Sequence, residues 1–350
     1  MLRILDKDHS VEWNEIVKSF ENWDVYYLYE YAYSFALHGD GEPFLCYFED
    51  NDIRLCYVVM QKDIADFKPL DQMIEKGKYF DWETPYGYGG PLADGVLEDK
   101  SDDLLKKELT KYCRGNNIVS QFVRFHPLLE NWTVWEKGIE TRYLRDTIFM
   151  DISSPEAIWQ NIESKNRNMI RKAQKNNVRV ERAPIDDIQA FIPLYKATME
   201  KNGADAYYIF HQDYFDFLKR MDKNACLFYA LYEDKVISAA IIFYNEKFMH
   251  YHLSGSDWEY RSLASSNFLL YEAAMWGAKK GIEKFHLGGG MTPDDSLFGF
   301  KKQFNRKERG KFVVGRTVFD EEKYAYLLKC RKDFDLEFNV NNSFMIQYRR

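Results

Sequence analysis

The second half of the chain carries the clearest alternation of apolar and polar segments. Three apolar runs, at residues 225–232, 236–244 and 248–253, are separated by short polar turns, a pattern typical of three antiparallel strands. A strand at 178–183 and helices at 187–201 and 212–221 are predicted before them. After them the pattern predicts a helix at 264–280, a strand at 284–287, a triple-glycine loop, a helix at 297–304 and a strand at 311–319.

A basic amphipathic helix is predicted ahead of this segment. Ser153 and Pro155 mark its start, because a serine cap followed by a proline in the first turn favours a helix N-terminus. Apolar residues recur on one side as far as residue 173, while Arg167 and Arg171 repeat on another. We expect one helix running from this start to about residue 175.

The first half predicts a mixture of helices and strands. Polar Asp50, Asn51 and Asp52 separate two strand-like runs and indicate a hairpin. The loop at 84–91 holds three glycines and two prolines, which favour tight turns. Helices are expected at 11–20, 28–37 and 100–115, and strands at 43–49, 53–60, 118–125 and 145–152.

The order of elements in the second half is strand, two helices, three antiparallel strands, helix, strand, helix, strand. This order resembles the GNAT acyltransferase fold, and the first half contains a partial version of it. We therefore expect an α/β (α+β) protein of tandem GNAT-like domains, each a mixed, mainly antiparallel sheet flanked by helices. The predicted domains are 1–150, an N-terminal GNAT-like domain, and 151–350, which carries the family motifs.

Charge is concentrated locally. The chain has 48 basic and 55 acidic residues, so no overall positive field favours nucleic acid or an anionic membrane. Residues 163–182 nevertheless contain seven basic and two acidic side chains, and residues 301–311 contain six and one. Such clusters suit phosphate groups, although a solvated helix face is the plain structural alternative for the first.

The cysteine spacing and the lengths of the apolar runs indicate the cellular compartment. The five cysteines are scattered and never spaced as C-x-x-C, which favours free thiols in a reducing cytoplasm. The charged N-terminus lacks the apolar stretch of a signal peptide, and no apolar run approaches the roughly 20 residues that span a bilayer. We expect a cytoplasmic protein without a transmembrane segment.

Several segments carry a more specific resemblance. They are residues 165–175, 194–199, 250–255 and 286–290, together with the Phe300-Lys301-x-x-Phe304 motif. They look like the FemAB-type branch of GNAT transferases, the peptidyltransferases that add amino acids to peptidoglycan precursors. The resemblance covers about residues 150–320, and the loop at 84–92 suggests that it extends into the first domain.

The resemblance implies that an amine of a cell-wall precursor attacks an activated acyl carbon. Lys301 would stabilise the oxyanion or hold a phosphate, as a cation in a dry cleft can, and Tyr251 and His252 are the candidate proton relay. The implied substrate-binding residues are Arg167, Arg171, Lys172, Gly288, Gly289, Gly290 and Tyr86. An aromatic residue or a histidine on a strand is, however, more often a packed core residue than a proton relay, and this is the structural alternative for Tyr251 and His252.

The acyl donor is left open between aminoacyl-tRNA and acyl-CoA, with no tightly bound cofactor. Enzymes of the GNAT superfamily that use acyl-CoA usually carry a glycine-rich loop that cradles the pyrophosphate, and residues 261–266 lack those glycines. Ser265 and Ser266 could still offer backbone amides at a helix start. The helical arm of long FemAB members is also missing, so the chain resembles the shorter, armless members.

Alternative functions follow from the same residues. One is an acetyl-CoA-dependent N-acetyltransferase acting on a small amine or amino sugar, and another is a non-catalytic module that binds glycan or RNA. The expected partner is a nucleotide-linked or lipid-linked envelope precursor, joined by the acceptor end of tRNA if the donor is aminoacyl-tRNA. The acyl group, the acceptor, the oligomeric state and the role of the first domain in the site are left open.

Other chemistry is disfavoured. His250, His252 and His286 invite a zinc interpretation, but no Glu or Cys stands at a supporting spacing, so no metal is expected. Cys226 and Ser254 lack a recognisable nucleophile motif. The chain also lacks a Walker loop and a Rossmann glycine fingerprint.

Overall fold

A computed structural model describes residues 1–50, 53–135, 138–292 and 294–350. The chain forms two compact units, one made of residues 1–144 and 312–350 and the other of residues 145–311. We call them the N-terminal unit and the central unit. Strands β7 (Glu140–Asp151) and β13 (Arg309–Val318) carry the chain from one unit to the other.

This division differs from the predicted domains 1–150 and 151–350. Residues 312–350 belong to the N-terminal unit because β13 pairs there with β6 (Ile118–Arg124), with Val314 opposite Arg124. Helix α10 (Glu321–Phe334) then buries Tyr324 and Leu327 in a core shared with Val119. Local sequence cannot reveal this return, because the pairing joins segments almost 200 residues apart.

The central unit is built on one mixed sheet. Its strand order is β7, β12, β11, β10, β9, β8, in which β11 and β12 run parallel and the other neighbours run antiparallel. The strands are β8 (Arg179–Pro184), β9 (Ala225–Tyr232), β10 (Lys235–Tyr244), β11 (Phe248–Ser256) and β12 (Lys284–Gly288). The predicted meander and the mainly antiparallel sheet are confirmed.

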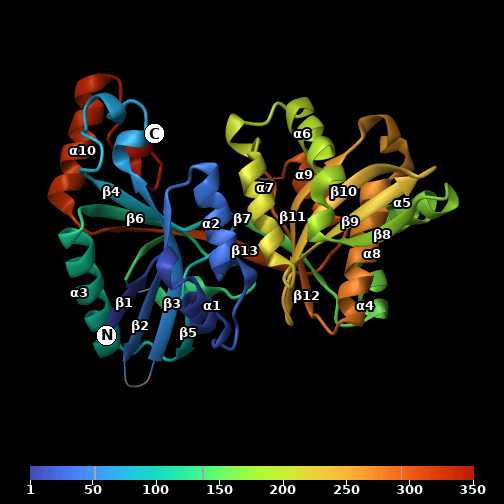
Figure 1. The fold of residues 1–350 in the computed structure, drawn as a ribbon, viewed down its shortest axis with the longest axis horizontal. Coiled ribbons are helices and arrows are strands. Elements are labelled where there is room, and N and C mark those ends of the chain that lie inside the picture. The colour runs from blue at the N-terminus through green and yellow to red at the C-terminus, as the bar shows by residue number, and fades with distance from the viewer. Residues whose placement is uncertain (51–52, 136–137, 293) are drawn as a thin grey trace. The chain divides into compact units, whose positions relative to one another are not determined.

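Helices cover the sheet of the central unit (Figure 1). One apolar core joins strand residues to side chains from α4, α5, α8 and α9, including Ile158, Ile170, Leu270 and Phe298. Helix α6 packs against β10 and β11. The helices are α4 (Pro155–Asn161), α5 (Ser164–Lys175), α6 (Phe191–Lys201), α7 (Gln212–Leu218), α8 (Ser265–Lys279) and α9 (Ser296–Lys302).

The single basic helix expected over 153–175 is two helices. A serine caps α4, but it is Ser154 and not the predicted Ser153; the Ser154 hydroxyl accepts from Ala157 N at 3.1 Å. The chain then becomes extended at Ile162 and Glu163, whose ψ angles are 134° and 148°, before α5 begins. The Ile162 side chain is fully buried in the core, so tertiary packing interrupts a helix that periodicity alone would continue.

The N-terminal unit has a sheet of the same design. Its order is β1, β2, β3, β4, β6, β13, with β4 and β6 parallel, the other neighbours antiparallel, and a short β5 beside β3. The strands are β1 (Leu2–Leu5), β2 (Glu42–Asp50), β3 (Ile53–Asp63), β4 (Phe80–Glu83) and β5 (Leu92–Gly95). The helices are α1 (Ser10–Lys18), α2 (Tyr29–His38), α3 (Asp99–Gly115) and α10.

The two strand orders correspond position by position. In each unit the last strand of a meander pairs in parallel with a strand that follows one long helix. These parallel pairs are β4 and β6, with α3 between them in the sequence, and β11 and β12, with α8 between them. The tandem arrangement expected from the sequence is therefore confirmed. The predicted hairpin between β2 and β3 forms, with Asp50 opposite Ile53, and its turn at 51–52 lies outside the described residues. No helix in the described ranges is long and apolar enough to cross a membrane.

Candidate active site

The candidate site lies at the carboxyl end of the parallel pair in the central unit. Pairing between β11 and β12 ends with His250 opposite His286, although β11 continues to Ser256 and β12 to Gly288. Groups from the turn after β12 can therefore reach the continuing part of β11. In α/β proteins the carboxyl ends of parallel strands are the usual place for a ligand site.

Asp295 organises the glycine turn that follows β12. Its carboxylate accepts from the backbone N–H of Met291 at 2.6 Å, of Thr292 at 3.0 Å and of Phe298 at 2.7 Å. The last of these bonds caps α9. A Cβ on Gly290 would stand 2.3 Å from an oxygen of Asp295, so only glycine fits beside this carboxylate.

Lys301 extends from α9 back to the same turn. Its Nζ donates to the carbonyl oxygen of Gly289 at 2.7 Å, and the side chain is only 8% exposed. Burial lowers the pKa of Lys301 to about 8, against the opposing attraction of Asp295. Within the described ranges this ammonium makes no salt bridge, so a buried cation faces the glycine turn without a paired carboxylate.

Tyr251 on β11 lies beside this cation. The centre of its ring lies 5.9 Å from Lys301 Nζ, and its hydroxyl donates to Ser254 Oγ at 2.5 Å. Burial raises the pKa of Tyr251. The structure thus brings together two of the three residues predicted to be catalytic.

His252 contacts a different set of groups. Its Nε2 lies 2.6 Å from the hydroxyl of Tyr214 on α7, and its ring lies tilted against Phe243, with the ring centres 4.3 Å apart. Leu253 pairs with Ile241 and Tyr251 with Ile242, so His252 is the extra residue of a β-bulge. Burial lowers its pKa to about 3, with a smaller effect of His250, so the imidazole is neutral near pH 7.

The predicted phosphate-binding arginines lie on α5. Arg171 stands over the ring of Trp159 with its guanidinium carbon 5.1 Å from the ring centre, and Arg167 lies over the same ring at 6.0 Å. Arg167 also donates to Trp159 O and Ser164 Oγ, both at 3.1 Å. Lys172 is exposed on the same helix. These contacts are separate from those of Lys301, so the single phosphate pocket stays a prediction.

Ser265 and Ser266 form the first turn of α8, as expected. The helix begins after Ala264 in the left-handed conformation (φ 56°) and has no side-chain cap. Nearby, the Oδ1 of fully buried Asn166 accepts from Asn267 Nδ2 at 2.8 Å, while its own Nδ2 has no hydrogen-bond partner within the described residues. Uncapped backbone amides at a helix start attract anions.

Tyr86 and its glycine-rich loop lie in the N-terminal unit. The Tyr86 carbonyl accepts from the hydroxyl of Tyr31 at 2.5 Å, and its ring stacks on Phe35 at 5.5 Å. A Cβ on Gly90 (φ 81°) would lie 2.7 Å from the ring of Phe125. These glycines are explained by close packing within their own unit.

Sequence reasoning missed the residues that shape the turn. Arg145 donates to Gly290 O at 2.8 Å and also to Met291 O, and buried Asn305 donates to Phe149 O at 2.6 Å. An aspartate just before a predicted helix was a detectable cap signal for Asp295. Arg145 left no such signal, because it lies 145 residues from its partner.

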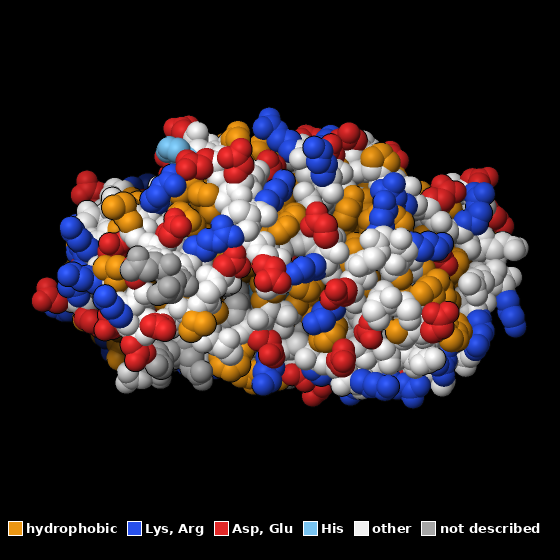
Figure 2. Space-filling model, turned by 90° about the horizontal axis from the view of Figure 1, so that it is seen from below, with side chains coloured by type: hydrophobic (Ala, Val, Ile, Leu, Met, Phe, Trp, Pro, Cys, Tyr) orange, Lys and Arg blue, Asp and Glu red, His pale blue; other side chains and the backbone are white. Residues whose placement is uncertain are grey.

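No single charge dominates the face of the molecule drawn in Figure 2. Basic, acidic and hydrophobic side chains are interspersed on it. This agrees with the net charge of −7.

Comparison with known proteins agrees with this architecture. The acetyltransferase (GNAT) domain family matches residues 162–302, which include the glycine turn and Lys301. No curated protein matches the chain by sequence.

Several solved structures are similar in fold. FemX has 14% sequence identity and a TM-score of 0.67, with 93% of this chain and 99% of FemX covered. The C-terminal domain of a putative lysylphosphatidylglycerol synthetase from Agrobacterium fabrum has 13% identity and a TM-score of 0.57, covering 92% and 95%. L-PGS from Bacillus licheniformis has 12% identity and a TM-score of 0.53, covering 87% and 90%. The expected likeness to a FemAB-like GNAT branch is confirmed in family domain and fold.

Proposed function

We propose that this chain, which carries a GNAT acyltransferase domain, transfers an aminoacyl or acyl group to an amine of a cell-wall or envelope precursor. The observation that carries the proposal is the position of Lys301. Its buried ammonium faces a glycine turn at the carboxyl end of the parallel strands, with no carboxylate paired to it within the described residues. A cation held in this way suits the negative charge that develops on an acyl oxygen.

In the proposed reaction the amine nitrogen attacks the acyl carbon and a tetrahedral oxyanion forms. Lys301 stabilises that oxyanion while the nitrogen loses a proton. The new C–N bond remains when the bond from carbon to the leaving oxygen or sulfur breaks, and the leaving atom takes up the proton. Tyr251 borders Lys301 and holds its hydroxyl toward Ser254, so it is proposed to position the acceptor amine.

The donor is proposed to be aminoacyl-tRNA. The resemblance of residues 165–175 and 286–290 to the FemAB branch supports this choice, as does the absence of pyrophosphate-cradling glycines in residues 261–266. Arg167, Arg171 and Lys172 would then contact phosphates of the precursor or of the tRNA acceptor end. Five free and buried cysteines agree with a reaction in the reducing cytoplasm.

A CoA-dependent N-acetyltransferase is the second candidate. It is favoured by the start of α8 at Ser265 and Ser266, which has no side-chain cap, beside Asn166 Nδ2, which has no hydrogen-bond partner among the described residues. Backbone amides there could bind a pyrophosphate without glycines. A thermal shift separates the two donors, because a ligand at 100 times its Kd stabilises by about 2.7 kcal/mol.

The deciding experiment incubates the full chain with a nucleotide-linked muropeptide and either aminoacyl-tRNA or acetyl-CoA, and follows acceptor mass by mass spectrometry. We expect the acceptor to gain the mass of one aminoacyl group. Lys301→Met should form this product roughly a hundredfold more slowly. Lys302→Met is the matched control, since Lys302 is exposed on the same helix. Equal rates in the two variants would remove Lys301 from the proposal, and product from acetyl-CoA alone would favour the second candidate.

A further inference from the structure

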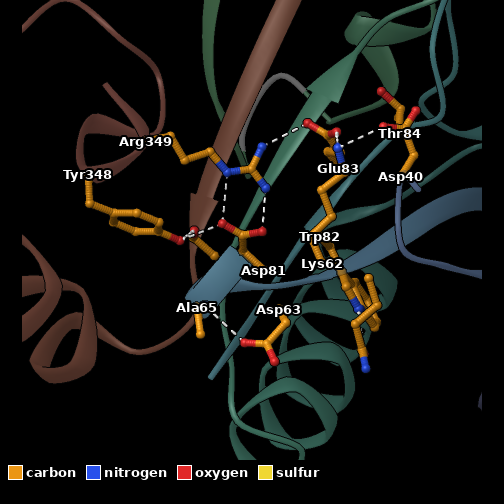
Figure 3. Close-up of polar contacts among 12 residues, drawn as sticks. Asp40, Lys62, Asp63, Ala65, Asp81, Trp82, Glu83, Thr84, Tyr348 and Arg349 are labelled. Atoms are coloured by element: carbon orange, nitrogen blue, oxygen red, sulfur yellow. Dashed lines mark hydrogen bonds and ion pairs between the residues drawn. The ribbon is translucent and has the colours of Figure 1, made fainter. Parts of the chain in front are cut away.

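The N-terminal unit contains a buried network of charges around β4. Arg349 donates to Asp81 through Nε at 2.8 Å and through Nη2, and to Glu83 through Nη1 at 2.7 Å (Figure 3). Tyr348 donates its hydroxyl to Asp81 at 2.8 Å. On the other side, Lys62 pairs with Glu83 at 2.6 Å. The network ties the C-terminal residues to a central strand 266 positions earlier in the chain.

The charges in this network compensate one another. Burial raises the pKa of Glu83, but Arg124, Arg349 and Lys62 together outweigh that effect and hold the pKa well below its usual range. Glu83 is therefore an anion that already has its cations. Asp81 differs, because its complete burial raises its pKa despite the two-point contact with Arg349 and the hydrogen bond from Tyr348.

A cavity of about 380 Å³ lies beside this network. Its position corresponds to the candidate active site of the other unit, because Glu83 ends β4 and Phe122 and Arg124 end the parallel strand β6. The volume falls in the range of small-molecule sites. Apolar wall residues are Phe122, Leu144, Val314, Phe344, Met345 and Ile346.

The C-terminal segment 343–349 forms one wall of the cavity and is held in place from several points. Arg142 donates to Ser343 O at 2.5 Å, Arg316 donates to Met345 O at 3.0 Å, and Arg349 binds β4 as described. The cavity is therefore a built feature of this unit, bordered on one side by a segment that several hydrogen bonds hold against the sheet.

Two of the arginines that line the cavity keep hydrogen-bonding capacity. Arg142 is 42% exposed and its nearest carboxylate oxygen, on Glu140, lies 3.9 Å away; that carboxylate is held more closely by Arg316. Arg124 stacks on Phe122 at 4.8 Å and reaches Glu83 only at 3.5 Å. Since a guanidinium has five N–H donors, both can donate to a further acceptor at the cavity.

We propose that this cavity binds a small molecule with an apolar body and one anionic group, the apolar part lying against the C-terminal segment and the anion meeting Arg142 and Arg124. The balance of the lining supports this chemistry. Glu83 is held more closely by Lys62, at 2.6 Å, and by Arg349, at 2.7 Å, than by Arg124, at 3.5 Å. Arg124 and Arg142 are therefore the cations with remaining donors at the cavity, and most of the other lining residues are apolar. Binding at this cavity does not depend on the proposed transfer reaction, because it involves neither the acyl donor nor the acceptor amine.

The test uses two fluorescent probes with the full chain. 8-Anilinonaphthalene-1-sulfonate carries an aryl body and one anion, and N-phenyl-1-naphthylamine has the same rings without the sulfonate. We expect saturable binding of the sulfonate at one site and weaker binding of the neutral probe. Arg142→Gln should weaken the sulfonate roughly tenfold, since a charge-assisted bond is lost, and leave the neutral probe unchanged.

Arg3→Gln is the matched control, because Arg3 is a similarly exposed arginine (46%) of the same unit beside a carboxylate. Leu144→Trp should obstruct the cavity and weaken both probes, and Lys301→Met should affect neither, which keeps this test independent of the proposed reaction. Probe binding that is unchanged in Arg142→Gln and Leu144→Trp, or equally weakened in Arg3→Gln, would overturn the proposal.

Discussion

The two units share a strand order but differ in whether the cation near the end of the parallel strand pair is matched by carboxylates. In the central unit, buried Lys301 contacts a carbonyl oxygen and no carboxylate pairs with it within the described residues. In the N-terminal unit, Arg349 is held by Asp81 and Glu83 together. The central unit thus buries a cation without a paired carboxylate among the described residues, while the N-terminal unit uses Arg349 to hold the C-terminal segment on β4.

The residue types fit these two uses. A guanidinium forms planar, two-point contacts with carboxylates and does not lose its proton in proteins. An ammonium responds to burial, and the pKa of Lys301 falls to about 8 as a result. Topology therefore supplies a comparable place in both units, and the two places differ in how their cations are compensated.

The largest expected effect comes from breaking the compensated network. Arg349→Met leaves Asp81 and Glu83 buried without their shared cation and should lower the free energy of unfolding by about 3 to 5 kcal/mol, measured by urea denaturation. Arg350→Met is the control, since Arg350 is exposed and stacks only loosely on Phe344, 5.8 Å away. Equal urea midpoints in the two variants would contradict the structural role of the network.

The next effect is the pH dependence of transfer. If the protonated form of Lys301 is needed, kcat/KM falls as pH rises through about 8, tenfold per pH unit above that value, because the neutral amine cannot stabilise an oxyanion. Lys301→Arg should keep some activity and move the decline above pH 10. A rate that rises through pH 8 would instead assign Lys301 the role of a base.

A smaller effect of opposite sign is expected for stability in the central unit. Lys301→Met removes a buried cation without a salt-bridge partner, at the loss of one hydrogen bond to Gly289. We expect the free energy of unfolding at pH 7 to rise by about 1 kcal/mol. The gain should shrink between pH 8 and 10.5, where the wild-type side chain becomes neutral in the folded state but stays charged in the unfolded chain. If Lys301→Met lowered the free energy of unfolding as much as Arg349→Met, the proposed difference between the two cations would be wrong.

The smallest effect concerns Tyr251. Tyr251→Phe removes the hydroxyl that donates to Ser254 but keeps the ring beside Lys301, so transfer should fall about threefold, in line with one weak hydrogen bond. Tyr271→Phe, which keeps the edge contact with Trp159, serves as the control in the same rate assay. A hundredfold loss in Tyr251→Phe would show that the hydroxyl itself reacts.

Much of the fold was accessible from local sequence. The meander at 225–253, the long helix before β12 and the tandem order follow from apolar periodicity and turn residues, which act over a few positions. The break between α4 and α5 was not accessible, because Ile162 is drawn into a core formed by distant strands. The path of residues 312–350 was missed for the same reason, since their partners on β4 and β6 lie far back in the chain.

By itself, the sequence determined the element order, the glycine turn, and a lysine of a family motif beside that turn, since each is written in neighbouring residues. Only the tertiary structure decided that Tyr251 contacts Lys301 while adjacent His252 contacts Tyr214, and that Arg349 closes a network on β4. Those outcomes depend on which side chains a bulged strand and a returning segment bring into contact. Burial and charge compensation act between such neighbours in space, which the order of residues along the chain does not specify.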